Sequence, residues 1–75
     1  MPAKIKGFAV CLRNEGVPAS LEVRKLYPYI EDLDAEANNL IHVVDESGED
    51  YLYPAPLFRK LALPGDVQRA LRMAS

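Results

Sequence analysis

Cys11 and His42 are the only cysteine and the only histidine in the chain, and both side chain types take part in catalysis. They could form a thiol–imidazole pair, but only if the strands that carry them are neighbours. Cys11 lies in the apolar segment 8–12, where a thiol usually packs as a small hydrophobic group. His42 lies within an expected strand, and the sequence shows no third group to orient it. We therefore expect an inert, buried Cys11, a structural His42 and no catalytic residues.

Four carboxylates could also do chemistry, because they lie close together in the sequence: Asp45, Glu46, Glu49 and Asp50. Oxygen ligands of this kind bind Ca²⁺ in proteins. Their spacing does not match that of the helix–loop–helix calcium motif, and the residues between them, Ser47 and Gly48, are typical of a turn. We therefore expect solvated charges at a turn, with no metal ion and no cofactor.

Basic side chains could bind nucleic acid, although the overall charge does not favour it. Nine lysines and arginines are outnumbered by eleven aspartates and glutamates, which gives a formal charge of −2. A local patch could still hold RNA or DNA if the fold gathers five cations: Arg13, Arg24, Lys25, Arg59 and Lys60. This is the alternative function, and it predicts binding that weakens steeply as salt rises.

The length of the chain points to a single domain. A chain of 75 residues buries about 60% of its unfolded surface, which suffices for one modest core. The apolar run after Lys4 and Lys6 ends at Arg13, too early for a signal peptide, and no run approaches the roughly 20 residues of a membrane helix. With one unpaired cysteine, a cytoplasmic domain without a membrane partner is expected.

Residues 7–13 alternate in the manner of a strand packed on a core. The expected core face carries Phe8, Val10 and Leu12. Residues 14–20, with a glycine and a proline, predict a loop. Residues 21–30 predict a bent second strand or a turn near Arg24-Lys25. Pro28 cannot donate to a ladder, so we expect it at a sheet edge or a bulge. One helical turn is expected within residues 31–39, ended by an asparagine in the left-handed conformation.

The clearest element is a hairpin, with strands at 40–44 and 51–53 and a turn at Ser47-Gly48. Prolines then stop the second strand, and a 3₁₀ turn and a closing strand at 59–63 are expected. A helix follows from Pro64, with Val67, Ala70, Leu71 and Ala74 on one stripe. It would dock on its own domain by default, and otherwise on a second copy or on another protein. An exposed edge strand could also pair with a second copy or with a client strand. The expected division is a tail (1–6), a β domain (7–63) and a helix with its tail (64–75).

This order of elements resembles that of Src-homology-3-like barrels, and Tyr51–Phe58 resembles the strand, proline and 3₁₀ turn before the last strand of that family. The chain is also similar to a small group of uncharacterised bacterial proteins with this barrel, over Cys11–Asn14, Lys25–Tyr27 and Asp45–Pro54. The resemblance covers residues 8–63. It implies a mainly β, five-stranded Src-homology-3-like barrel with a short C-terminal helix and a bacterial origin, but no activity.

Peptide-binding members of that family hold proline-rich segments in a groove lined by aromatic rings. The positions here that match the groove are Glu15, Glu22, Leu40, Pro54 and Leu57. Two of them are leucines where the family usually has Trp and Tyr, so stacking on proline rings would be poor. We expect a non-catalytic module for protein–protein interaction with an unidentified protein or peptide partner.

Overall fold

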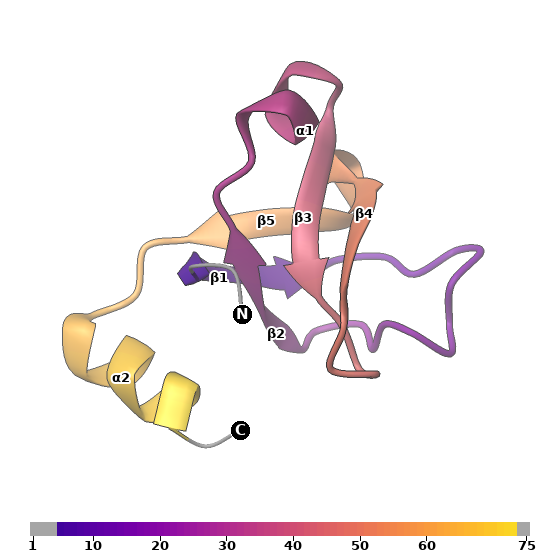
Figure 1. The fold of residues 1–75 in the computed structure, drawn as a ribbon. Coiled ribbons are helices and arrows are strands. Elements are labelled where there is room, and N and C mark those ends of the chain that lie inside the picture. Colours follow the sequence, from indigo (N-terminus) through magenta and orange to yellow (C-terminus); the bar gives the residue numbers. More distant parts are fainter. Residues whose placement is uncertain (1–4, 74–75) are drawn as a thin grey trace.

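The chain folds into one sheet of five antiparallel strands with three short helices. The computed structural model describes the backbone of residues 5–73 and the side chains of residues 5–71. The strands are β1 (Ile5–Cys11), β2 (Leu26–Ile30), β3 (Leu40–Val44), β4 (Asp50–Pro54) and β5 (Phe58–Leu61), in the order β4-β3-β2-β1-β5 (Figure 1). The prediction of a mainly β fold is confirmed. The described pairings leave the sheet open between its two edge strands, β4 and β5.

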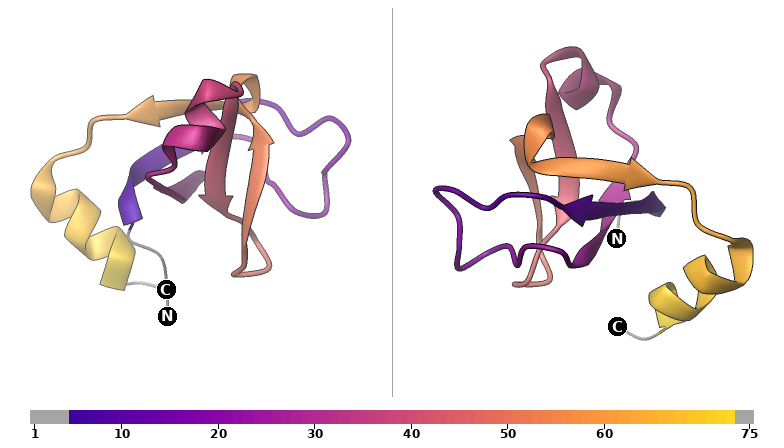
Figure 2. Two further views of the ribbon diagram at one scale, coloured as in Figure 1. Left: turned by 45° about the horizontal axis from the view of Figure 1, so that its top comes forward. Right: turned by 180° about the vertical axis from the view of Figure 1, so that it is seen from behind.

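The helices are α1 (Leu33–Ala37), the 3₁₀ turn η1 (Ala55–Leu57) and α2 (Gly65–Met73). The backbone N–H of Ala35 donates to Asp32 Oδ1 at 3.0 Å, which caps α1 as the single expected turn. Asn39 has φ of 60° and ends this segment, as expected. Helix α2 also forms, but it stands to one side of the sheet (Figures 1 and 2). Ala74, expected on its apolar stripe, lies outside the described residues.

The hairpin forms where it was predicted. β3 and β4 pair from Leu40 with Pro54 to Val44 with Asp50, and Gly48 in the turn has φ of 83°, which only glycine adopts without strain. Several strand boundaries were predicted wrongly, among them the end of β5, which lies at Leu61 and not at residue 63. β1 begins at Ile5, inside the expected tail, and β2 begins only at Leu26. Arg24 has φ of 71°, and this left-handed residue belongs to the turn that was the alternative to a bent strand from residue 21.

The core lies on the face of β1 opposite to the expected one. Ala9 and Cys11 are fully buried among aromatic rings, whereas Leu12 is 47% exposed. The ring of Phe58 lies 6.2 Å from Tyr27 and 6.1 Å from Tyr53, measured between centroids. Since these large rings fill the interior, only small side chains fit on the strand beneath them. Phe8 is buried too, but on the outer face.

Pro28 lies in an interior strand, so the expectation of an edge strand or a bulge at Pro28 is wrong. The bulge falls in β1, between Ile5 and Gly7. On its other side β2 pairs with β3 only through Tyr29 with Val43 and Ile30 with His42. The ladder thus ends next to Pro28, the residue without an N–H, and the two strands separate from there.

Candidate functional site

The separation of β2 from β3 opens a groove of about 680 Å³ on the outer face of the sheet. Its walls are mostly apolar and come from β1, β2, β3 and α2. They are formed by Ile5, Phe8, Leu26, Pro28, Val44 and Leu71. Leu26, Pro28 and Val44 are only half-buried, so the groove offers apolar surface to a ligand.

One end of the groove is polar, and Glu46 organises it. Glu46 Oε2 accepts hydrogen bonds from the Tyr27 hydroxyl at 2.5 Å and from Lys25 Nζ at 2.6 Å. The Tyr27 hydroxyl also accepts from the backbone N–H of Glu22 at 2.7 Å. The hydrogen bond from Lys25, and to a smaller extent the one from Tyr27, holds the pKa of Glu46 below its ordinary value. Burial raises the pKa of Tyr27 far above the ordinary value of a tyrosine. The hairpin end is thus tied to the loop that precedes β2.

Asp45 lines the same end of the groove, and the expectation that it is a solvated turn charge is wrong. Its residue is 6% exposed. The Tyr53 hydroxyl donates to Oδ2 at 2.5 Å, and Ser47 donates to Oδ1 from its backbone N–H and its hydroxyl, at 2.9 and 2.5 Å. Burial by itself would raise the pKa of Asp45, but these hydrogen bonds bring it below the ordinary value. Asp45 is therefore a structural anion.

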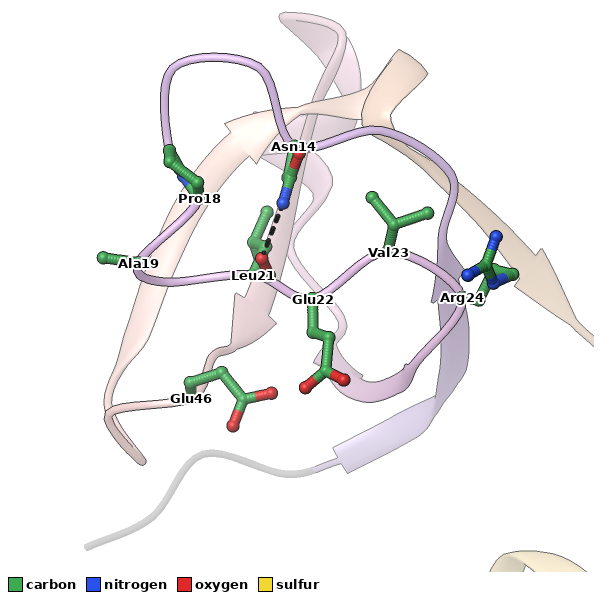
Figure 3. A pocket seen from close by; sticks show the side chains of 8 residues that line it. All are labelled: Asn14, Pro18, Ala19, Leu21, Glu22, Val23, Arg24 and Glu46. Carbon is green, nitrogen blue, oxygen red and sulfur yellow. Dashed lines mark hydrogen bonds between the residues drawn. The ribbon is translucent and has the colours of Figure 1, made fainter.

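A second hollow of about 580 Å³ adjoins the groove, on the other side of Glu46. It is bounded by the loop before β2, which the Asn14 side chain holds by donating to the Leu21 carbonyl at 3.0 Å. In Figure 3 the carboxylates of Glu22 and Glu46 lie next to each other, whereas Arg24 points away from them. A cation that entered this hollow would meet the carboxylate of Glu22 and that of Glu46, which already binds Lys25.

Cys11 and His42 cannot react together. β1 and β3 are separated by β2, and Cys11 points into the core whereas His42 is on the outer face. Cys11 is buried, as expected, and desolvation raises the pKa of its thiol. His42 has partners that the sequence did not indicate: Nδ1 lies 3.0 Å from Asp32 and Nε2 lies 2.6 Å from Asp50. Within residues 5–71 no cluster of ligating side chains suits a metal ion.

The five positions mapped onto a peptide groove do not form one. Leu57 belongs to the core and is 6% exposed. Leu40 and Pro54 are cross-strand partners, far along β3 and β4 from the hairpin end, and Glu15 faces Arg13 at 3.6 Å. Of this set, only Glu22 reaches one of the two hollows beside Glu46.

The five candidate cations are not one patch either. Arg13 pairs with Glu15, Lys25 with Glu46, and Lys60 with Glu36 at 3.6 Å while lying 4.8 Å above the Tyr29 ring. Arg24 and Arg59 have no carboxylate partner within residues 5–71. Both adjoin the end of β1: the N–H of Arg24 donates to the Cys11 carbonyl, and Arg59 pairs with Val10.

Sequence reasoning missed most of the groove. Phe8, Leu26 and Val44 come from three strands that only the folded sheet brings together. One signal was present, since a proline within a strand marks a place where a ladder must end. The proline alone could not show which neighbouring strand would stop pairing with β2.

The described residues contain no helix that is both long enough and apolar enough to cross a bilayer. Comparison with known proteins assigns no family: no family model, curated protein or solved structure matches the chain.

Proposed function

We propose that the chain is a non-catalytic Src-homology-3-like module that binds an extended segment of a partner protein in the groove between β2 and β3. The groove itself is the observation that carries this proposal. It joins half-buried apolar walls to a hydrogen-bonded polar end, which is the usual composition of a recognition site. The strand order and the 3₁₀ turn before β5 support the barrel relationship. Bacterial origin and cytoplasmic location stay predictions.

The backbone of β2 favours an extended ligand. Cys11 N donates to Lys25 O at 2.9 Å and Arg24 N donates to Cys11 O at 2.8 Å, so these two residues face β1. Since successive residues of an antiparallel strand face opposite sides, the N–H and C=O of Leu26 face the groove. A partner strand could pair with them and place an apolar side chain between Leu26 and Val44.

Charge selects the residues next to that apolar side chain. Glu46 stands between the groove and the second hollow, where Glu22 lies beside it. A lysine or arginine of the partner would reach Glu22 and would share Glu46 with Lys25, while its apolar neighbour fills the groove. The proposed ligand is therefore an extended segment that combines an apolar side chain with an adjacent basic one.

Selection of peptides from a random library against the pure protein tests this proposal. We expect the selected peptides to share an apolar residue next to lysine or arginine. Leu26→Asp should weaken their binding by at least about tenfold, because it places a charge in the apolar wall. Leu33→Asp is the matched control, since Leu33 is 70% exposed on α1, away from the groove.

Two outcomes would contradict the proposal: no peptide selected above background, or equal binding to the two variants. The test can also support the alternative function. Arg24 and Arg59 are the observation that favours nucleic acid, because neither is neutralised within the described chain. Binding of a short RNA or DNA at low salt that is lost on Arg59→Glu and insensitive to Leu26→Asp would favour this alternative instead.

A further inference from the structure

The two free edges of the sheet carry opposite charges. β4 and β5 are the first and last strands in the sheet order, and no strand within residues 5–73 pairs with their outer sides. β4 begins with Asp50 and follows Glu49, whereas β5 carries Arg59 and Lys60. An unpaired edge readily accepts another strand, so these edges are candidate interfaces.

Hydrogen bonds at the ends of the hairpin show which backbone groups of β4 face outward. Asp45 N donates to Glu49 O, and Ala55 N donates to Asn39 O, each at 3.0 Å. Bonded and non-bonded pairs alternate in an antiparallel ladder, so the N–H and C=O groups of Asp50 and Leu52 point to the free edge. Pro54 ends this run because it has only a carbonyl to offer.

The same reasoning applies to β5. Leu12 N donates to Leu57 O at 2.7 Å, and the register then makes Arg59 with Val10 the next bonded pair. The N–H and C=O of Lys60 therefore point to the free edge. Each edge strand thus presents backbone donors and acceptors to a further strand.

The outer faces of the two strands also match. β4 carries Asp50 and Leu52 on the face opposite to the core, and β5 carries Arg59 and Leu61 on that face. Leu52 is 50% exposed and Leu61 38%. A junction between the strands would bring a carboxylate near a guanidinium and cover two exposed leucines.

We propose that the chain self-associates by pairing β4 of one copy with β5 of the next. Unlike edges attract, whereas a pairing of β4 with β4 or of β5 with β5 gains no attraction between opposite charges. The junction is head-to-tail, so every copy that joins leaves one acidic and one basic edge free. It therefore builds rings or chains rather than two-fold dimers.

Analytical ultracentrifugation of the pure protein over a range of concentrations and salt tests this. The average mass should exceed that of the monomer and fall as salt rises. Asp50→Arg and Arg59→Glu should each weaken association by at least about tenfold, and an equimolar mixture of the two variants should recover it, because each supplies the charge that the other lacks. Arg69→Glu, on exposed α2 away from both edges, is the matched control.

A wild-type protein that stays monomeric at high concentration and low salt overturns the proposal. So does a mixture that associates no better than its components, or an Arg69→Glu variant that behaves like the edge variants. Because Asp50→Arg also removes a contact of His42, amide hydrogen exchange of the wild type gives a test without variants. Exchange at Leu52 and Lys60 should slow as concentration rises, while unchanged exchange at both would refute the junction.

Discussion

Asp45 is the clearest case of a residue whose role differs from its sequence context. It stands in a run of acidic turn residues, yet its carboxylate is buried and satisfied by Ser47 and Tyr53. A buried carboxylate without hydrogen-bond donors destabilises the folded state far more than an exposed one does. The hydrogen bonds of Asp45 therefore hold the hairpin end that forms one wall of the groove.

Asp45→Asn should lower the free energy of unfolding by about 1–3 kcal/mol at neutral pH, because an amide cannot accept all of these hydrogen bonds. The pKa of Asp45 is lower in the folded than in the unfolded chain, so its contribution is present above about pH 4 and is lost as the pH falls through the folded value. The difference in free energy of unfolding between wild type and variant, measured by urea unfolding, should therefore become smaller in acid.

Tyr53→Phe is the control for this prediction, since it removes one donor and keeps the ring. The double variant should lose less stability than the sum of the two single variants, because both act on one hydrogen bond. Strict additivity, or a difference that does not change with pH, would show that Asp45 acts otherwise.

At the scale of elements, the loop between β1 and β2 is shaped by a residue in an unfavourable conformation. Arg24 has φ of 71°, a left-handed conformation that is strained for residues other than glycine. Asn39, with φ of 60°, adopts it with less strain. The strained residue lies where the chain turns into β2, next to Lys25 at the polar end of the groove.

Replacing Arg24 by glycine should raise the free energy of unfolding by up to about 1 kcal/mol, since glycine adopts positive φ without strain and only part of this gain is offset in the unfolded chain. Asn39→Gly should give a smaller gain. Chemical unfolding of both variants beside the wild type gives the comparison. A loss of stability in Arg24→Gly would mean that contacts of the arginine side chain outweigh the strain.

At the scale of the whole molecule, the core is built by the sheet and its loops, without a residue of α2 in the core cluster of the described chain. The residues of the core cluster all lie between Ala9 and Phe58, and among the described residues of α2 only Leu71 lines the groove. We therefore predict that the boundary expected near residue 63 separates a sheet that folds by itself from helix α2, which lines the groove through Leu71.

Residues 1–63 should accordingly unfold cooperatively, with a melting temperature only a few degrees below that of the full chain. They should bind an apolar fluorescent dye more strongly, because the groove loses its cover. Leu71→Ala in the full chain should increase dye binding in the same direction, and Val67→Ala, at a residue already 39% exposed, should not. A shortened chain without a cooperative transition would place α2 in the folding unit.

The sequence by itself determined the local features of this protein: the hairpin, the single turn of α1, the 3₁₀ turn and the start of α2. These depend on turn residues, prolines and alternation, which act over a few neighbouring positions. The burial of Cys11 was also predicted correctly, because Cys11 lies in a continuous apolar segment.

Only the tertiary structure decided which face of β1 points inward, because both faces are apolar and the choice depends on distant rings at Tyr27, Tyr53 and Phe58. It likewise buried Asp45, paired three of the five candidate cations and opened the groove beside Pro28. Each of these outcomes joins segments far apart in the chain, and local patterns carry no information about which distant side chain fills a given space.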